Sequence, residues 1–489
     1  MLFNSHIFML LFLPLLLAGW YFLNWKKKFQ LAQGYLIGMS LWFYAYANLQ
    51  YLWLLLFSCL IGWLLSCLPE KIFSEKGKKV LTGVGCVFHL GLLGYFKYSN
   101  FFLENLNTVF HTDFPMLQIL LPVGISFYTF QQLAYLIDRC RGDAPRDSFF
   151  DYLTFMVYFP QLLQGPILLR SEFMGQLKEP ERRRFHAERF SEGIQFFVFG
   201  LAKKVLLADT LAKAVNYGYS NVSMLDSISA LLLAVGYLTE LYFDFSGYCD
   251  MAVGLGKMIG LEVAENFDAP FHSASVKEFW RRWHMTLGRF FTRYVYIPLG
   301  GNRRGKMRTL CNVMIVMLLS GLWHGAAWTF VLWGFLHGVG MIWDNLEHPH
   351  LPKKWMRQAA TFAYVCMTFV FFRAESIAQG VDVLKSIVSL KWNGFMFQMA
   401  SALDMTECYM ITKALSMKLP GLLSWFWLGI FVVLIAICFR VLSGEKVSGV
   451  VALQRQKGYS RLYPVLLAVL FTWSMISMTG VSEYLYFSF

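Results

Sequence analysis

Residues 423–439 read LSWFWLGIFVVLIAICF and contain no charged side chain. Similar runs, nearly free of charge, recur at 7–23, 80–96, 228–243 and 465–478. The hydrocarbon core of a bilayer is about 30 Å thick, so a helix that crosses it needs roughly 20 apolar residues. Because backbone groups inside lipid must satisfy their own hydrogen bonds, these runs predict helices. The pattern therefore predicts an all-α, polytopic transmembrane protein.

The composition agrees with that prediction. Hydrophobic residues make up 57% of the 489 positions and charged residues only 15%, whereas soluble domains carry about 25% charged residues. The formal net charge of +13 comes from basic residues in short segments between apolar runs. That arrangement is typical of cytoplasmic loops near anionic lipid. We therefore expect membrane lipid as a partner and no nucleic acid.

The distribution of basic residues also predicts a topology. Lys26, Lys27 and Lys28 follow the first apolar run, so the positive-inside rule places them in the cytoplasm and the N-terminus outside. A cleaved secretory signal would carry its positive charge before the apolar run. Alternating basic and non-basic loops then predict about 11–12 crossings. The expected helices lie near 7–24, 32–48, 50–68, 80–98, 115–138, 190–208, 223–245, 310–322, 327–343, 358–372, 423–439 and 462–480.

We expect one membrane domain over residues 1–489, with two special regions. Residues 247–308 hold the densest charge and form a cytoplasmic or re-entrant loop region, and 373–420 form an amphipathic stretch on the extracytoplasmic surface. The apolar stretch 152–169 is broken by Pro160, Gly165 and Pro166, which favours a segment that enters the membrane and returns. Such backbone is tolerated only where protein or water shields it.

Neither disulfides nor a metal site are expected. The nine cysteines are scattered singly, without a CxxC pair, which argues against a disulfide framework. No His, Cys, Asp or Glu cluster has the spacing of metal ligands.

The segment SGLWHGAAW at 320–328 holds the most informative ionisable residue, His324. The preceding apolar run of about 13 residues spans only about 20 Å, which predicts a turn inside the membrane with His324 at its tip. A histidine there can act as a general base or bond a neighbouring helix as a structural residue. For His337, which lies in a plain helical run, the structural interpretation is favoured.

A second cluster is EFWRRWH at 278–284. Arginine binds phosphate in a bidentate manner, so Arg281 and Arg282 suit an acyl donor that carries phosphates. A lipid headgroup anchor is the alternative. His284 is a candidate for the same cavity as His324.

Two further features stay open at this level. The acidic residues Glu240, Asp244 and Asp250 either pair with these arginines or bind the polar part of a donor. The chain ends in YFSF at 486–489, which is either an interfacial aromatic belt or, at Tyr486, a tethered phenol that accepts an acyl group and passes it outward.

Read in order, these segments resemble the membrane-bound O-acyltransferase family, especially its bacterial branch with the alginate O-acetylation membrane subunit and the teichoic acid D-alanyl transfer protein. The resemblance covers almost the whole chain. The matching segments are LPVGISFYTFQ (121–131), YFPQLLQGP (158–166), DFSGYCDMA (244–252), ENF (265–267), EFWRRWH (278–284), YIPLGGN (296–302) and WHG (323–325).

The resemblance implies a multi-helix fold with a tunnel towards His324, which takes the place of the family's catalytic histidine. His284 takes the place of its second histidine, and Tyr486 lies in the terminal aromatic motif and is a candidate acyl relay. Residues in the matching segments, namely Trp323, Arg281, Arg282, Asp244 and Asn266, are candidates for substrate binding. The chain departs from the family pattern at one place. Many relatives carry Arg-Asp-Tyr just before the YIPLGG segment, whereas this chain has Thr292-Arg293-Tyr294 there. An acidic residue is absent there, which puts in doubt any salt bridge assigned to that position.

The resemblance implies transfer of an acyl group, most simply acetyl, from a cytoplasmic thioester such as acetyl-CoA to a cell-surface polysaccharide. It implies a bacterial cytoplasmic membrane, no bound cofactor, and a separate extracytoplasmic acyltransferase as partner. Two alternatives remain: D-alanyl transfer from a carrier protein to teichoic acid, and a transporter or polymer exporter without chemistry.

Overall fold

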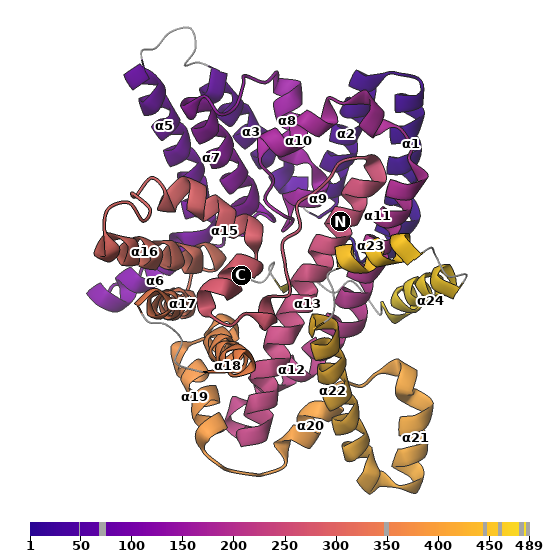
Figure 1. Ribbon diagram of the computed structural model, residues 1–489. Helices are drawn as coiled ribbons and strands as arrows, with labels where there is room; N and C mark the ends of the chain where they lie inside the picture. The colour runs from indigo at the N-terminus through magenta and orange to yellow at the C-terminus, as the bar shows by residue number, and fades with distance from the viewer. Residues whose placement is uncertain are drawn as a thin grey trace. The chain divides into compact units, whose positions relative to one another are not determined.

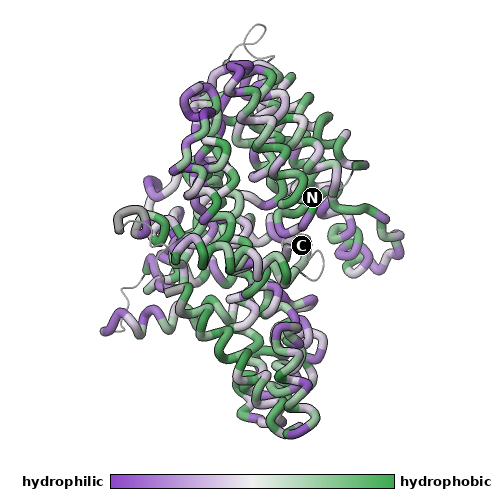
Figure 2. The backbone as a smooth tube through the Cα atoms, turned by 90° about the vertical axis from the view of Figure 1, so that its right-hand side faces the viewer, coloured by the Kyte–Doolittle hydropathy of each residue, from purple (hydrophilic) through white to green (hydrophobic). Residues whose placement is uncertain are grey.

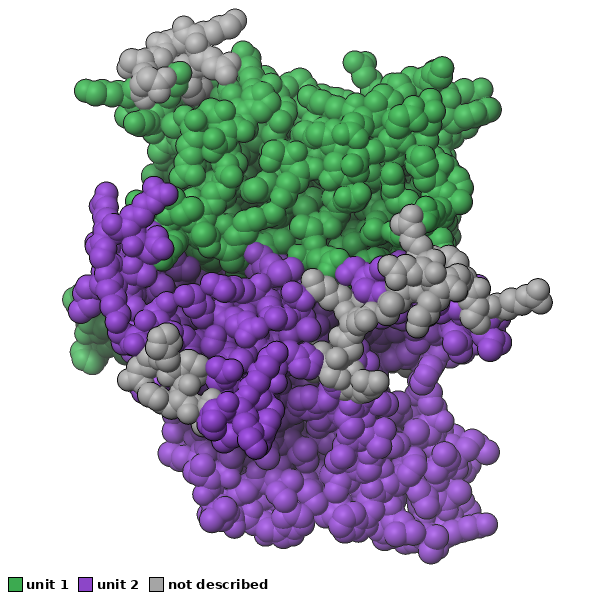
Figure 3. Space-filling model, in the orientation of Figure 1, with its two compact units in different colours: residues 1–198, 248–265, 286–298 green, residues 199–247, 266–285, 299–489 purple. Residues whose placement is uncertain are grey.

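The computed structural model describes residues 1–47, 49–67, 75–346, 352–443, 447–457, 462–478 and 484–485. Within these ranges every regular element is a helix (Figure 1), so the all-α prediction is confirmed. The chain forms two compact units, shown in different colours in Figure 3. Unit 1 comprises residues 1–198, 248–265 and 286–298, and unit 2 comprises 199–247, 266–285 and 299–489.

Unit 1 contains the N-terminal helices and two later insertions. Here and below, η marks a 3-10 or π helix. Its elements are η1 (Phe8–Phe12), α1 (Leu13–Trp25), α2 (Phe29–Ala47), η2 (Leu49–Tyr51), α3 (Leu52–Cys67), α5 (Glu75–Leu93), η3 (Gly94–Tyr98), α6 (Ser99–Phe110), α7 (Ile125–Arg141), α8 (Phe149–Val157), α9 (Phe159–Leu162), α10 (Arg170–Leu177), η4 (Pro180–Arg183), most of α11 (Ala187–Ala202), most of α15 (Met285–Phe291) and η8 (Thr292–Tyr296).

Unit 2 holds the candidate site residues. The long helix α13 (Ser227–Ile259) belongs to this unit up to residue 247 and to unit 1 beyond it. The other elements are η5 (Lys203–Ala208), α12 (Asp209–Ser220), η6 (Val222–Met224), η7 (Pro270–His272), α14 (Val276–Arg282), α16 (Lys306–His324), α17 (Trp328–Leu346), α18 (Lys354–Arg373), α19 (Ile377–Val388), α20 (Phe395–Ser401), η9 (Thr406–Cys408), α21 (Tyr409–Lys418), α22 (Pro420–Ser443), α23 (Val447–Lys457) and α24 (Leu462–Ser477).

Six helical spans in the described ranges are long and apolar enough to cross a membrane. Figure 2 shows hydrophobic residues along much of the helical backbone. The six spans are Phe8–Trp25, Leu49–Cys67, Lys76–Phe110, Ser227–Ile259, Lys306–His324 and Pro420–Phe439. They support a polytopic membrane protein, whereas the number of about 11–12 crossings stays a prediction.

Three expected boundaries were wrong. The helix expected from residue 115 begins at Ile125, because Pro115 and Pro122 lie before it and Gly124 adopts a left-handed φ of 78°. The loop region expected from residue 247 begins after Ile259, since α13 continues through Gly247 as regular helix. The cytoplasmic or re-entrant position of 247–308, and the extracytoplasmic position of 373–420, stay predictions.

The third correction concerns the run before His324. α16 has 19 residues, which corresponds to roughly 28 Å of helix, because Lys306, Arg308 and Thr309 belong to the helix as well. The short-helix argument that placed His324 inside the membrane therefore fails. By contrast, the predicted interruption of 152–169 is confirmed, since α8 ends at Val157 and α9 covers only Phe159–Leu162.

The interior of unit 1 contains a cluster of buried aromatic rings. Phe3 stacks on Tyr248 with ring centroids 4.7 Å apart and also contacts Phe43 and Phe159. The indole N–H of Trp20, on α1, donates to the carbonyl of Ile259, 3.1 Å away, at the end of α13. These contacts fix the N-terminal helices against the last turns of α13 within the unit.

Arg293, the residue at which the chain departs from the family pattern, forms salt bridges within unit 1. Arg293 pairs with Asp138 of α7 at 3.0 Å and with Asp143 at 2.8 Å. The Tyr294 hydroxyl donates to the second carboxylate oxygen of Asp138, at 2.9 Å. Acidic residues distant in sequence thus provide salt bridges at the position where the local acidic residue is absent.

Helices α16 and α17 of unit 2 cross at very close range through two glycines. The Cα atoms of Gly321 and Gly334 face each other: a Cβ built on Gly334 would lie 3.4 Å from the Cα of Gly321 and 2.5 Å from the carbonyl oxygen of Met317. Small residues at such a crossing let two membrane helices pack backbone against backbone. The crossing lies one turn before His324, the last residue of α16.

We predict that Gly334→Ala destabilises the protein, because the added methyl group would overlap the Met317 carbonyl. Overpacking of this kind costs about 1–3 kcal/mol. The matched control is Gly429→Ala in α22, where a Cβ meets nothing within 4 Å. The measurement is the thermal unfolding midpoint of both variants in detergent; equal midpoints for the two variants would contradict the close crossing.

Candidate functional site

His324 lies at the C-terminal end of α16 in a box of aromatic rings. Its side chain is buried, with an exposed fraction of 4%. The ring centroids of Trp333 and Phe372 lie 5.3 and 5.2 Å from that of His324, and Trp323 lies at 4.9 Å. Gly325 follows in an extended conformation and ends the helix. The chain therefore presents an imidazole in largely apolar surroundings.

His284 is the second histidine of the same cluster. Its ring centroid lies 6.4 Å from that of His324 and 6.1 Å from that of Trp323, and Phe245 packs on it at 4.7 Å. The structure thus brings the candidate residues His284, His324 and Trp323 together within unit 2. The fourth member is Asn266, whose Oδ1 lies 3.1 Å from His284 Nδ1.

The contact with Asn266 defines the protonation pattern of His284. An amide oxygen only accepts hydrogen bonds, so Nδ1 carries the hydrogen and donates it. Nε2 then carries a lone pair, and it is buried without a hydrogen-bond partner among the described residues. Burial lowers the pKa of His284 to about 3, so the ring is neutral near pH 7. Its Nε2 is therefore an acceptor that is available to a bound group.

The backbone around His284 is strained and held from both sides. His284 has a φ of 46°, a region that non-glycine residues adopt only at an energetic cost. Two backbone hydrogen bonds of 2.9 Å join this segment to the chain around Asn266, from Met285 N–H to the Asn266 carbonyl and from Asp268 N–H to the Arg282 carbonyl. Strain that neighbouring contacts enforce in this way is typical of functional sites.

His337 of α17 differs from both histidines because its two ring nitrogens are satisfied. Trp280 donates to Nδ1 at 3.2 Å. Thr368 gives its single hydroxyl hydrogen to the Val365 carbonyl, so its oxygen accepts from His337 Nε2 at 2.9 Å. These contacts hold one neutral tautomer and join α14, α17 and α18. They agree with the structural interpretation that the sequence favoured.

Asp244 lies in a separate buried charge cluster of unit 2. Lys204, on η5, bonds Asp244 at 2.6 Å and Asp209 at 2.8 Å. The other carboxylate oxygen of Asp244 accepts from the backbone N–H of Leu485 at 3.1 Å, and the Lys204 ammonium lies 4.6 Å from the ring centroid of Tyr484. The cluster thus holds the chain just before its C-terminus. Tyr486 itself lies outside the described residues.

Sequence reasoning missed Lys204. The signal was present, because Lys203 and Lys204 stand within an otherwise apolar stretch, and ionisable residues in such stretches are functional candidates. Of the alternatives for Asp244, pairing with the arginines near 281–293 is not what the structure shows, since its cationic partner is Lys204.

The two remaining candidates lie at the end of α14. Arg281 is exposed. Arg282 pairs with Glu278 one turn earlier at 2.9 Å and donates to the Asp268 carbonyl at 3.3 Å. Among the described residues, no group of three or more His, Cys, Asp or Glu side chains is placed to hold a metal ion.

Comparison with known proteins assigns the family. Residues 144–379 match the family model of the membrane-bound O-acyltransferases. The chain is 35% identical to the peptidoglycan O-acetyltransferase of Helicobacter pylori, over 80% of each chain. It is 39% identical to the probable alginate O-acetylase of Azotobacter vinelandii, over 77% of this chain and 76% of that one. The chain belongs to the membrane-bound O-acyltransferase family.

A more distant relative is the teichoic acid D-alanyltransferase of Bacillus subtilis, which is 28% identical over 52% of this chain and 69% of its own. The family and these relatives make this O-acyltransferase an enzyme that takes its acyl group from a donor. Of the two alternatives, an acyltransferase and a transporter without chemistry, the family and its relatives support the acyltransferase. The resemblance inferred from the sequence motifs is thereby confirmed.

For this O-acyltransferase we predict that His337→Gln keeps most of the acyl transfer, because Gln supplies one donor and one acceptor. His337→Leu leaves the groups of Trp280 and Thr368 without a partner and costs about 1–3 kcal/mol for each orphaned group. The check is the thermal midpoint in detergent together with acyl ester formation. A large loss of ester in a stable His337→Gln protein would refute the structural role.

Proposed function

We propose that this enzyme moves acetyl groups from a cytoplasmic thioester, acetyl-CoA, across the bacterial cytoplasmic membrane for O-acetylation of a cell-surface polysaccharide. The observation that carries the proposal is the buried pair of His324 and His284, which lie in the WHG and EFWRRWH segments of an O-acyltransferase chain. The bacterial relatives named as acetylating enzymes match at 35% and 39% identity over most of this chain.

His324 is the proposed general base. It takes the proton of an accepting hydroxyl while the hydroxyl oxygen attacks the thioester carbonyl, and the proton then passes to the departing thiolate of CoA. A thioester is already activated, so the step needs a positioned base and no covalent intermediate on the histidine. The aromatic box of Trp323, Trp333 and Phe372 excludes water that would otherwise hydrolyse the donor.

His284 and its neighbours are proposed to position the reacting groups. The Nε2 lone pair of His284 faces a buried environment and suits a hydrogen-bond donor of the substrate, with Asn266 holding the ring. Arg281 and Arg282 are the proposed contacts for the donor's phosphates. We propose that the acetyl ester then moves outward through Tyr486 to a separate extracytoplasmic acyltransferase, which modifies the polymer.

D-alanyl transfer from a carrier protein is the second candidate. The D-alanylating relative in the comparison matches only about half of this chain, at 28% identity, so the acetyl donor is favoured. The acid released from the polymer by mild alkali distinguishes the two, since acetate and D-alanine differ in mass.

The test compares wild-type enzyme with His324→Gln at matched membrane expression. Glutamine has a similar size and hydrogen-bonding groups but cannot accept the proton, so ester-linked acetate on the surface polysaccharide should fall about 100-fold or more. His337→Gln is the matched control, a buried histidine on the adjacent helix that should keep its activity. Unchanged acetate in His324→Gln cells would refute the assignment of the base.

A further inference from the structure

Unit 2 contains a cavity of about 710 Å³, a volume typical of ligand-binding sites. Residues of η5, α12, α13, α17 and the end of α18 line it, together with Leu485. One wall consists of Phe330 and Phe372, whose ring centroids lie 4.9 Å apart. Since Phe372 also contacts His324, the cavity lies one aromatic ring away from the proposed base.

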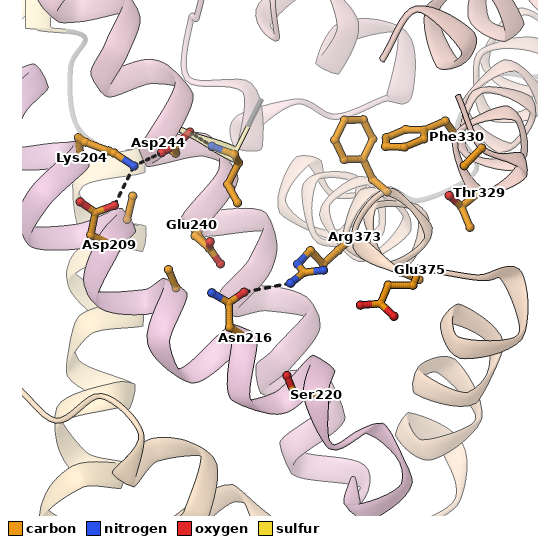
Figure 4. A pocket seen from close by; sticks show the side chains of 16 residues that line it. Lys204, Asp209, Asn216, Ser220, Glu240, Asp244, Thr329, Phe330, Arg373 and Glu375 are labelled. Carbon is orange, nitrogen blue, oxygen red and sulfur yellow. Dashed lines mark hydrogen bonds and ion pairs between the residues drawn. The ribbon is translucent and has the colours of Figure 1, made fainter. Parts of the chain in front are cut away.

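The cations that line the cavity already have partners. Lys204 is bound by Asp209 and Asp244. Arg373 donates to the side-chain oxygen of Asn216 at 3.0 Å, and its guanidinium lies 5.0 Å from the ring centroid of Tyr219. Figure 4 shows both sets of bonds at the cavity wall. Lys204 thus has two carboxylate partners, whereas the partners of Arg373 shown here are a neutral amide and an aromatic ring.

Glu240 is the lining group whose bonding is incomplete. Its side chain is buried, with an exposed fraction of 2%, and its Oε2 has no hydrogen-bond partner among the described residues. Figure 4 shows its side chain between the Lys204 cluster and Arg373. A buried carboxylate oxygen without a partner is costly, so a ligand that donates hydrogen bonds would relieve this cost.

The charges near Glu240 indicate which donor fits. Three carboxylates, those of Asp209, Glu240 and Asp244, stand against the two cations Lys204 and Arg373, and the exposed Glu375 adds a further negative charge at the cavity. A bound cation favours the ionised form of Glu240, and when all three carboxylates are ionised one further positive charge balances these five side chains. The faces of Phe330 and Phe372 suit a cation as well, because aromatic rings attract ammonium and guanidinium groups.

We propose that this cavity receives a lysine or arginine side chain of a partner polypeptide, whose cationic group bonds the Glu240 carboxylate. The inference rests on the proposed function, in which an extracytoplasmic acyltransferase collects the acyl group. The inserted side chain docks that partner beside Phe372, and so beside His324. An uncharged sugar could donate a hydrogen bond to Glu240 but would not neutralise its negative charge. An anionic ligand would be repelled by the Glu240 carboxylate.

The test measures the binding of small probes to the purified full chain by saturation-transfer NMR, in the absence of acetyl-CoA. The probes are N-acetyl-lysine methylamide, its uncharged norleucine counterpart and N-acetylglucosamine. Only the lysine probe should bind saturably. Glu240→Gln, which keeps the shape and removes the charge, should weaken its binding about tenfold or more. The control Glu375→Gln, which changes an exposed carboxylate, should change the binding much less.

Equal binding of the lysine and norleucine probes, no binding of either, or tighter binding of N-acetylglucosamine would each overturn the proposal. The comparison of probes uses wild-type protein, so it decides even if Glu240→Gln fails to fold. His324→Gln should bind the lysine probe normally. The two proposals can therefore fail independently. Loss of probe selectivity refutes the docking cavity alone, whereas retained acetylation by His324→Gln refutes the catalytic assignment alone.

Discussion

The close crossing of α16 and α17 is the constraint on which the candidate site depends. Gly321 and Gly334 bring the two backbones into contact, and this contact fixes the end of α16 against the start of α17. His324 is consequently held between Trp333 of one helix and Phe372 of α18. A larger residue at the crossing would move the imidazole away from the rings that surround it.

The buried polar groups around the candidate site differ in how completely they are hydrogen-bonded. His337 has both nitrogens satisfied and joins three helices. His284, held on a strained backbone by Asn266, keeps one buried nitrogen as an acceptor. Glu240 likewise has a buried oxygen without a partner among the described residues. Because such groups are costly unless something pairs them, we propose that His284 Nε2 and Glu240 Oε2 are the atoms that the substrate and the partner bind.

The sequence was sufficient for the fold class, and it named candidate site residues from motifs, for physical reasons. Charge-free runs such as 423–439 require helices in lipid. The motifs around His284 and His324 made these residues candidates for one cavity, and the structure places their rings 6.4 Å apart. Helix ends were less predictable: α13 continues past Gly247 and α16 begins at Lys306, because helical backbone tolerates polar residues and glycine where packing supports it. The Lys204–Asp244 pair and the Asp138–Arg293 pair join residues distant in sequence, and no local pattern specifies them.

The most direct test of the account is a transfer measurement on purified enzyme reconstituted in vesicles, with acetyl-CoA labelled in its acetyl group on the side of the basic loops. The account predicts base-labile acetyl ester and one free CoA thiol for each ester formed, with both products absent in His324→Gln vesicles and present in His337→Gln vesicles. Ester formation at the wild-type rate by His324→Gln, or none by the wild-type enzyme when a hydroxyl acceptor is supplied, would contradict acyl transfer at His324.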